Sequence, residues 1–571
     1  MNTSTTTTVA SSVSNPKASR QWLITLAGSI LLIVGSLLSW CFVPDLLGDL
    51  RLNFNPGAVQ LYTIVLGVAS LFFLLLRRGM FHTVDALLDS SRALRALGVT
   101  ATALMVLIVV VVAFQAPGLA NADPGLYVTL VGGVLVLAGA WEMPHDPKVD
   151  PVAVHLPGWV EILVIVVILA VGLFVAAYAL GIADGTVFTL FLGFVAGLST
   201  AFARAGLFHW IGVVAQRHRH VLTLGAFVVA FLFPFTQNGS DANMSIATQV
   251  IIFATTALGL NIVVGLAGLL DLGYIAFLGA GAYVGATMSY SAFATIGWKP
   301  PFIIVMIIGA LVSAALGLII GTPTLRVSGD YLAIVTLAFG EIFRLTMGNL
   351  DGNNGPYLTR GPNGIPAIPD LEIGGFNFAD SHAIFGITIN RFGNYYFLLL
   401  LVAAFIITVF TRLNNSRIGR GWVAIREDEK AAEAMGVNIF GLKLFAFAGG
   451  AFLAGLAGTI KAHQDVSVTP DQYVFLESAF LLAAIVLGGM GTVAGVLIGA
   501  TILKLLPEKL RFISDYRLLI FGLLLVLIMR VRPEGLVASR RRALEFHEEN
   551  TELAEQVEHA HLEGLTKEVT P

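Results

Sequence analysis

The chain has 571 residues, of which 56% are hydrophobic and only 12% are charged, and its formal net charge is −3. Soluble proteins carry about twice that share of charged residues, so the composition excludes an ordinary soluble chain of several domains. The single cysteine, Cys41, excludes an internal disulfide and any metal cluster held by cysteines. Apolar runs recur along the chain, and about 20 apolar residues in a helix cross a hydrocarbon core about 30 Å thick. We therefore expect an all-α polytopic membrane protein.

The N-terminal part of the chain is expected to form a disordered tail and a six-span extension. Residues 1–21 open with a polar stretch of low complexity, which is typical of disorder. The first apolar run is too long for a signal peptide and ends without a cleavage site of small residues. The six expected spans of the extension, residues 22–203, are 22–43, 59–76, 98–116, 125–141, 159–181 and 186–203.

A second series of apolar runs is expected to form the core of the protein, residues 204–538. Its first seven runs are 221–236, 246–265, 268–289, 301–321, 331–348, 394–411 and 440–463. The stretch IVLGGMGTVAG then places four glycines within eight residues, and each glycine costs about 1 kcal/mol relative to alanine inside a helix. We therefore expect a break there, with half-helices at about 477–488 and 493–506. A last run at 516–530 completes sixteen expected spans, six and then ten.

Lysine and arginine prefer cytoplasmic loops, and this preference orients the expected spans. With the N-terminus inside, the basic residues that fall on the cytoplasmic side include Arg77, Arg78, Arg92, Arg95, Arg217, Arg219, Arg326, Arg412, Arg417, Arg420, Arg426 and Lys430. Both termini, including the charged tail 539–571, are then cytoplasmic, and the long loop 349–393 lies outside. Lys504, Lys509 and Arg511 fit this topology poorly, because it leaves them outside or at the interface.

One segment in the middle of the chain is densely charged. Residues 426–433, REDEKAAE, hold six charges, with polar capping residues at 414–416 before them and Gly436 as the expected residue that ends the helix. The residues expected to form one apolar face of this helix are Trp422, Ile425, Ala432 and Met435. These patterns support equally a solvated helix on the membrane surface and a docking element for a cytoplasmic partner.

Six stretches of the chain together resemble a known family. They are LNIVVGLAGLLDLGYIAFLGAGAY (260–283), GDYLAIVTLAFGEIFR (329–344), GPNGI (361–365), GRGWVAIREDEKAAEAMG (419–436), ESAFLLAAIVLGGMG (477–491) and RPEGL (532–536). In this order they resemble the branched-chain amino-acid permeases of the LivM type, which are subunits of ABC importers. The resemblance covers about 220–538 and implies a ten-helix ABC importer permease core, preceded here by about six extra transmembrane helices.

The resemblance gives the charged segment a role. The coupling loop of such permeases has the degenerate signature Glu-Ala-Ala, three residues, then Gly; Ala431, Ala432 and Gly436 match it, and Lys430 stands where the signature has Glu. The residues that the resemblance assigns to coupling with the ATPase are Arg426, Glu427, Asp428, Ala431, Ala432 and Gly436.

The resemblance also implies the surroundings of the protein. It predicts a non-catalytic subunit in the inner (cytoplasmic) membrane that works with a second paralogous permease, two ATPase subunits and an extracytoplasmic substrate-binding protein. No phosphate-binding loop of the form G-x-x-x-x-G-K-[ST] occurs in the chain. We therefore expect ATP and Mg²⁺ to be used by the partner subunits, with no cofactor, metal or nucleic acid bound to this chain. The outer loop 349–393 is expected to contact the binding protein.

The residues expected to line a translocation path are Asn261, Phe277, Tyr283, Thr336 and Glu341. The glycines near them are equally consistent with close helix packing, which is ordinary in membranes. Glu341 and Arg344 lie three residues apart, and a structural ion pair and a place on the path both remain open. Asp271 and Glu477 are expected to act at helix ends.

The expected solutes are leucine, isoleucine and valine, as the resemblance implies. Urea or a short amide is the alternative within the same class of importer. An ion-coupled secondary transporter would need carboxylates deep in several spans and an inverted repeat, whereas only Glu341 is a central candidate here. A membrane scaffold or receptor, with the first six spans as its working part, is the third class considered.

Overall fold

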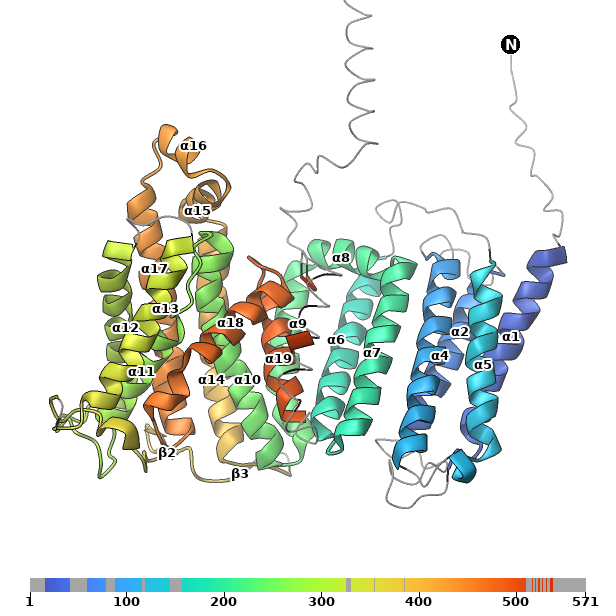
Figure 1. Ribbon diagram of the computed structural model, residues 1–571, viewed down its shortest axis with the longest axis horizontal. Coiled ribbons are helices and arrows are strands. Elements are labelled where there is room, and N and C mark those ends of the chain that lie inside the picture. The colour runs from blue at the N-terminus through green and yellow to red at the C-terminus, as the bar shows by residue number, and fades with distance from the viewer. Residues whose placement is uncertain are drawn as a thin grey trace, which may run out of the picture. The chain divides into compact units, whose positions relative to one another are not determined.

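The computed structural model describes residues 16–41, 59–78, 88–115, 119–143, 157–324, 330–353, 355–384 and 386–509, with a few positions between 516 and 537. Within these residues the architecture is all-α apart from two small hairpins (Figure 1). Thirteen helices in the described part of the chain are long and apolar enough to cross a membrane. The chain divides into two compact units, Met1–Gln237 and Asn238–Pro571.

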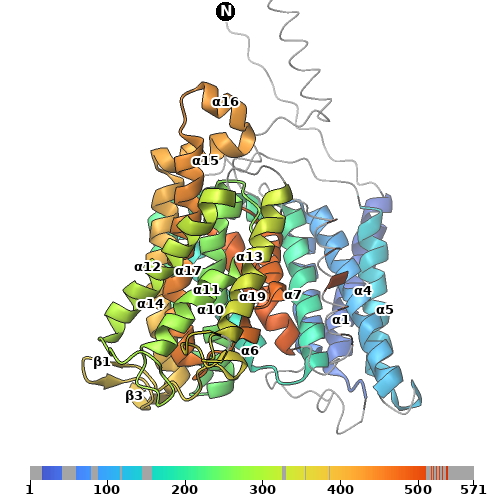
Figure 2. The same ribbon diagram turned by 60° about the vertical axis from the view of Figure 1, so that its left-hand side comes forward.

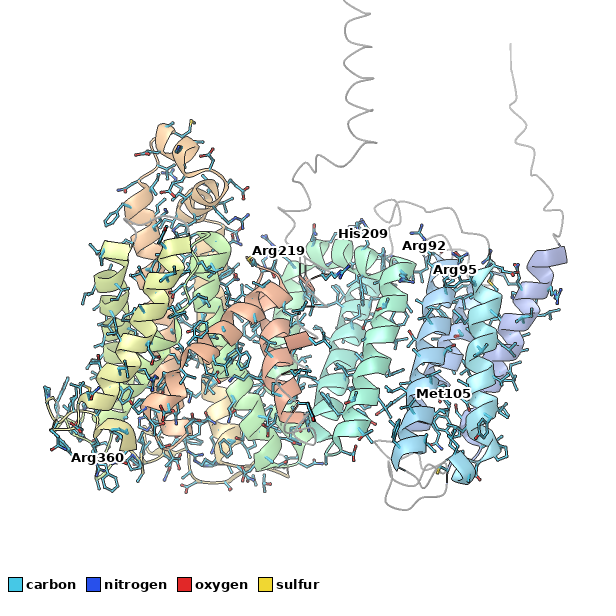
Figure 3. The ribbon with its side chains drawn as sticks, in the orientation of Figure 1. Arg92, Arg95, Met105, His209, Arg219 and Arg360 are labelled. Carbon is cyan, nitrogen blue, oxygen red and sulfur yellow. The ribbon has the colours of Figure 1, made fainter. Side chains whose placement is uncertain are left out.

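The helices of the N-terminal unit are α1 Pro16–Leu37, α2 Val59–Leu76, α4 Ser90–Gln115, α5 Pro124–Trp141, α6 Gly158–Gly181, α7 Gly185–Ala205, α8 Leu207–Arg217 and α9 Arg219–Leu232. Glycines bring α1 and α5 into close contact: a Cβ on Gly132 would lie 2.6 Å from the Leu32 nitrogen. At one end of α4, Arg92 and Arg95 lie together (Figure 3), and Arg95 Nε donates to the Ala140 carbonyl at the end of α5. The six spans expected within 22–203 are therefore present as helices.

Two boundaries in the structure differ from those expected for this unit. Residues 16–21 of the expected disordered tail belong to α1, which begins at Pro16, and proline is favourable at the first position of a helix. The expected boundary at 203/204 also differs from the division at 237/238. Helices α8 and α9 lie in the N-terminal unit because buried Glu161 of α6 pairs with Arg217 at 2.8 Å and with His218 at 2.9 Å. The run 221–236, expected as the first span of the core, is thus α9 of the N-terminal unit.

The helices of the C-terminal unit are α10 Asp241–Asn261 with a π-helical end η4 Ile262–Leu266, α11 Ile275–Thr287, α12 Phe302–Thr324, α13 Asp330–Asn349, α14 Arg391–Asn414, α15 Arg417–Glu427, α16 Glu429–Ala434, α17 Ile439–Gln464, α18 Phe475–Gly488 and α19 Val493–Lys509. Helix α11 starts later than the expected run 268–289, because Gly268 adopts a φ of 72° and residues 267–274 form a turn. The expected run 516–530 lies almost entirely outside the described residues, as does the tail 539–571.

Helix α17 is the centre of the C-terminal unit and packs against α11 and α12. A Cβ on Gly281 of α11 would lie 2.2 Å from the Gly455 carbonyl oxygen of α17, and one on Gly458 would lie 2.0 Å from the Leu278 carbonyl oxygen. Backbones that approach this closely leave no space for a side chain. Gly281 of the 260–283 stretch therefore serves close helix packing, as is common between membrane helices.

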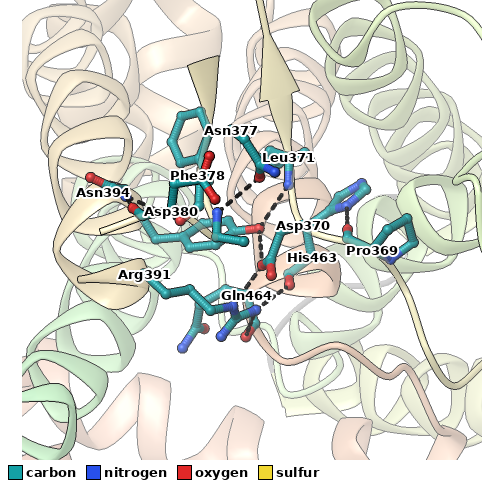
Figure 4. Close-up of polar contacts among 12 residues, drawn as sticks. Pro369, Asp370, Leu371, Asn377, Phe378, Asp380, Arg391, Asn394, His463 and Gln464 are labelled. Atoms are coloured by element: carbon teal, nitrogen blue, oxygen red, sulfur yellow. Dashed lines mark hydrogen bonds and ion pairs between the residues drawn. The ribbon is translucent and has the colours of Figure 1, made fainter. Parts of the chain in front are cut away.

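The loop between α13 and α14 is ordered and is bound to the ends of two helices (Figure 4). Its hairpins are β1 Glu372–Ile373 with β2 Phe376–Asn377, and β3 His382–Ile384 with β4 Ile387–Ile389. Asp370 accepts from Arg391 Nε at 2.6 Å and from the Tyr395 hydroxyl at 2.9 Å. Arg391 also donates to the carbonyls of His463 and Gln464 at the end of α17. The hairpins and the α15–α16 segment lie at opposite ends of this unit (Figure 2).

Helices α18 and α19 form an antiparallel pair with a break between them, which we call the broken hairpin (residues 475–509). Gly489 and Gly491 supply the break with φ values of 122° and 77°. Gly499 packs against Ala484, whose carbonyl oxygen would lie 2.1 Å from an added Cβ. Lys504 near the end of α19 meets Glu477 near the start of α18 at 2.8 Å. The chain thus returns to the end from which it came, as the glycine cluster predicts, and Lys504 has a partner there.

Candidate functional site

The charged segment protrudes beyond the neighbouring helices of the C-terminal unit (Figure 1). It consists of two helices, α15 and α16, and not of the single helix that the sequence predicts. The chain turns at Asp428, which has an extended backbone (φ −154°) and whose carboxylate accepts from the amides of Lys430 and Ala431 at 2.9 and 3.0 Å. Ser416 caps α15 in the same way, because its hydroxyl accepts from the Gly419 amide at 3.2 Å. The break arises because a capping aspartate starts a new helix.

Gly436 ends α16 as predicted. Its φ is 80°, its amide donates to the Glu433 carbonyl, and the Val437 amide donates to the Ala432 carbonyl. This pair of bonds is the Schellman arrangement, in which a left-handed residue closes a helix. Side chains avoid this conformation, so the position favours glycine whatever space surrounds it.

The buried face of the α15–α16 segment contains all but one of the residues predicted for the apolar face. Trp422, Ile425 and Ala432 are buried, whereas Met435 is 84% exposed. Met435 turns outward because it follows the last residue of α16, where the chain leaves the helix. The exposed residues of the segment therefore include Met435, Ala431 and Ala434 together with Lys430 and Glu433. This small surface is partly apolar and carries both signs of charge.

Three side chains fix the α15–α16 segment to the rest of the unit. Trp422 Nε1 donates to the Leu442 carbonyl at 2.7 Å, and Lys443 of α17 pairs with Glu429 at 2.7 Å. Arg426 reaches in the other direction and donates to the carbonyl of Gly265 in η4 at 3.0 Å, while it also pairs with Glu427. The segment is thus held both to α17 and to the end of α10.

Asn261, the first residue predicted for the path, is fully buried and connects α10 to the broken hairpin. Its Oδ1 accepts from the Gly491 amide at 2.9 Å, and its Nδ2 donates to the Thr492 carbonyl at 3.4 Å. The side chain satisfies backbone groups that the break would otherwise leave unpaired.

Phe277, Tyr283 and Thr336 are also buried in the interior of the C-terminal unit. Phe277 packs against Phe339 of α13, with ring centroids 5.5 Å apart. Thr336 accepts from the Leu272 amide at 3.1 Å and so holds the turn before α11 against α13. The structure therefore brings these residues together around the contact of α11 with α13.

Glu341 is the predicted path residue with the most exposed side chain, at 42%. It pairs with Arg344, whose Nε lies 3.0 Å from Glu341 Oε1, and Arg344 also pairs with Asp471 at 3.2 Å. Tyr283 lies nearby through its ring contacts with Phe343 and Tyr473. The Glu341–Arg344 ion pair left open by the sequence is formed within α13, and the second pair, Arg344 with Asp471, connects α13 to the segment before α18.

Asp271 and Glu477 lie near helix starts, as expected, but they differ in their contacts. Buried Asp271 accepts from the Gly273 amide at 2.9 Å in the turn ahead of α11. Glu477 is in the first turn of α18 and pairs with Lys504. Neither carboxylate belongs to the contacts of the α15–α16 segment.

The sequence interpretation missed two parts of this site. The π-helical turn η4 was not predicted, although Asn261, Gly265 and Gly268 at the end of an apolar run are a possible signal. The RPEGL stretch served only as a point of resemblance, whereas the amides of Leu536 and Val537 donate to the carbonyls of Leu487 and Gly488 at 2.9 Å. This contact joins residues far apart in the chain, so no local pattern reveals it.

Comparison of the sequence with known proteins assigns the chain to a family. The family described as the branched-chain amino acid transport system permease component matches residues 242–529, just over half of the chain. The chain belongs to this permease family. The matched region of this LivM-type permease begins in the first turn of α10, so the family comparison and the division into units agree on where the core starts.

Three relatives show the range of the permease's similarities. The high-affinity branched-chain amino acid permease protein LivM of Salmonella typhimurium is 38% identical over 331 residues, which cover 56% of this chain and 75% of that protein. The LivH permease protein of the same organism is 27% identical, with 50% and 91% covered. The ribose import permease protein RbsC of Haemophilus influenzae is 28% identical, with 50% and 83% covered. No solved structure matches the chain.

Proposed function

We propose that this LivM-type permease moves leucine, isoleucine and valine into the cell as the transmembrane subunit of an ATP-driven importer. The observation that supports this most is the protruding α15–α16 segment in a chain 38% identical to a branched-chain amino acid permease. The segment is fixed to α17 and α10, so movement of a partner bound to the segment is passed on to these helices. Arg426, Glu427, Asp428, Ala431, Ala432 and Gly436 are the proposed coupling residues.

The partners follow from the same proposal. Two separate ATPase subunits bind and hydrolyse ATP with Mg²⁺, and a groove in one of them receives the exposed surface of α16. A second permease of the LivH kind completes the membrane part, because a LivH protein is also a relative of this chain. Loop 350–390, at the opposite end of the C-terminal unit, receives the extracytoplasmic binding protein. This assignment places α15, α16 and both termini in the cytoplasm and the chain in the inner membrane.

The proposed path runs along the face of α13 that bears Glu341. A solute can contact only groups that are exposed. Glu341 and Arg344 present one negative and one positive charge to a zwitterion. Phe277, Tyr283 and Thr336 form the wall behind this face, and Asn261 holds the broken hairpin beside it. A lining of this kind suits an amino acid with an apolar side chain. The similarity to a protein named as a ribose import permease supports the proposal that the binding protein, and not the core, selects the solute.

The test is uptake of labelled leucine and labelled urea by cells with and without the gene. We expect deletion to abolish leucine uptake and to leave urea uptake unchanged. Leucine uptake that survives deletion, with loss of urea uptake, would replace the proposed solute. A second measurement addresses the division of labour: the purified chain alone should hydrolyse no ATP above background. Robust hydrolysis by a preparation free of other subunits would contradict the role as a permease.

A further inference from the structure

The guanidinium of Arg426 is directed into the permease and not toward a partner that docks on α16. Its Nη1 donates to the Gly265 carbonyl at 3.0 Å, and its side chain is only 27% exposed. Gly268, with a φ of 72°, makes room for it, because a Cβ there would lie 2.5 Å from Arg426 Cγ. A charged donor at the carbonyl end of a helix is favourable, so this contact is a strong one.

The carbonyl that Arg426 binds belongs to the π-helical turn η4. In this turn the Ala267 amide donates to the Ile262 carbonyl five residues back, which widens the helix. Asn261 stands directly before the turn and holds the Gly491 amide and the Thr492 carbonyl. Arg426 therefore binds η4 to α15, and Asn261 binds the start of the same turn to the break in the broken hairpin, so the backbone of residues 261–265 connects the two contacts.

The break is held from a second side as well. The Leu536 and Val537 amides bind the carbonyls of Leu487 and Gly488, and a Cβ on Gly489 would lie 2.1 Å from the Val537 carbonyl oxygen. Gly489 and Gly491 both have positive φ values, which glycine adopts without the steric cost that other residues meet, so the shape of the break favours glycine at both positions. The break is thus a defined joint between two contacts, one of which leads back to Arg426.

We infer that Arg426 is a positioning residue of the transport cycle, which transmits movement of the α15–α16 segment through η4 and Asn261 to the break between α18 and α19. The inference rests on the proposed function and adds to it the route of coupling inside the permease. The physical basis is that the guanidinium of Arg426 binds the Gly265 carbonyl and also pairs with Glu427 of α15, which keeps Gly265 and α15 at a fixed separation. The contacts of Trp422 and Glu429 with α17 hold the segment in place but do not reach the broken hairpin.

The first experiment compares two arginines of α15 in the complete complex reconstituted in vesicles. Arg426→Gln removes the contact with Gly265, whereas Arg420→Gln removes the same charge from an exposed position on the same helix. Leucine taken up per ATP hydrolysed should fall about tenfold in the R426Q complex, as expected for loss of a hydrogen bond to a charged group. It should stay near normal in R420Q, and R426K, which keeps a donor, should recover part of the loss.

Two outcomes of this comparison would overturn the inference. One is an unchanged ratio of uptake to hydrolysis in the R426Q complex. The other is loss of the ATPase subunits from the purified R426Q complex, which would assign Arg426 to docking. If the unmodified complex hydrolyses ATP but takes up neither leucine nor urea, the proposed solute is wrong, and the second experiment still tests the route.

The second experiment reads the break directly and needs no solute. Met490 lies between the two glycines of the break and is half-buried, and the native Cys41 is buried. A thiol reagent should label the Met490→Cys complex at a rate that changes when ATP is added. The change should persist in the R420Q background and disappear in the R426Q background. A nucleotide-dependent rate that survives R426Q, or is absent in R420Q, contradicts transmission through Arg426.

Discussion

Single residues set the geometry of the surface that we propose docks on the ATPase. Gly436 has a φ of 80°, and open space surrounds the position where its side chain would lie. Any effect of a substitution there comes from the backbone, since a left-handed conformation costs most residues about 1–2 kcal/mol. Asp428 acts through its carboxylate, which accepts from the amides of Lys430 and Ala431 in the first turn of α16.

We expect Gly436→Val to weaken docking of the ATPase and to reduce uptake, because it unwinds the end of α16. Gly449→Val is the matched control, since Gly449 also has open space around it but lies within α17. Co-purification of the ATPase subunits with each variant measures the effect. Normal subunit ratios and normal uptake in G436V would show that this helix end plays no part in docking.

Asp428 allows a separate test of the cap. Asp428→Ala should destabilise α16 by about 1 kcal/mol and weaken docking, whereas Asp428→Asn keeps an oxygen that can cap and should behave nearly like the original. Affinity of the purified ATPase for each variant provides the measurement. Equal losses in both variants would mean that the negative charge contacts the partner directly.

At the scale of elements, the broken hairpin depends on close contact between α18 and α19. Gly499 faces the Ala484 carbonyl oxygen, and Gly495 faces that of Gly488. Larger side chains at such positions force the helices apart, which typically costs about 1–3 kcal/mol. The glycines in this pair therefore have two uses: some turn the chain at the break, and others let the helices touch.

We expect Gly499→Val to lower the melting temperature of the purified protein by several degrees, because its side chain collides with backbone atoms of α18. Gly348→Val in α13 is the control, since nothing lies within 4 Å of an added Cβ there. Thermal unfolding in detergent compares the two. An unchanged melting temperature in G499V, together with a lowered one in G348V, would mean that α18 and α19 do not pack as described.

At the scale of the whole molecule, the N-terminal unit lies outside the matched family region, which begins at residue 242. Its helix α6 carries the buried Glu161 that pairs with Arg217 and His218. Removal of α6 leaves these two basic side chains without that carboxylate. The family comparison therefore leaves the whole N-terminal unit outside the matched region. Two helices of this unit, α8 and α9, lie in the part of the sequence first expected to be core.

We expect a truncated chain that begins at about residue 205 to insert and to assemble with its partners, because removal of six spans leaves the orientation of the core unchanged. Its stability should fall, since α8 and α9 lose their packing against α6. Membrane yield, co-purification and melting temperature measure the three effects. A truncated chain that is well expressed but fails to assemble would show that the first spans belong to the working permease.

The sequence by itself determined the long apolar helices of the described residues, the break between α18 and α19, and the end of α16. Apolar length marks a membrane helix, a glycine cluster marks a break, and a glycine after a charged helix marks its end; each is a local property of the chain. Met435 shows the limit of this reasoning, because its spacing suits the buried face but the chain has already turned away there. Asp428 shows the same limit, since it could continue one helix or start another.

Only the tertiary structure decided what the buried polar residues do. The sequence predicts polar Asn261 as a path residue. In the structure its side chain binds backbone groups of Gly491 and Thr492, more than two hundred residues away in the chain. Arg426 lies in the segment predicted to dock on the ATPase, and its guanidinium binds the Gly265 carbonyl. The packing of distant helices decides which backbone groups remain unpaired. A buried polar side chain then forms hydrogen bonds with those groups.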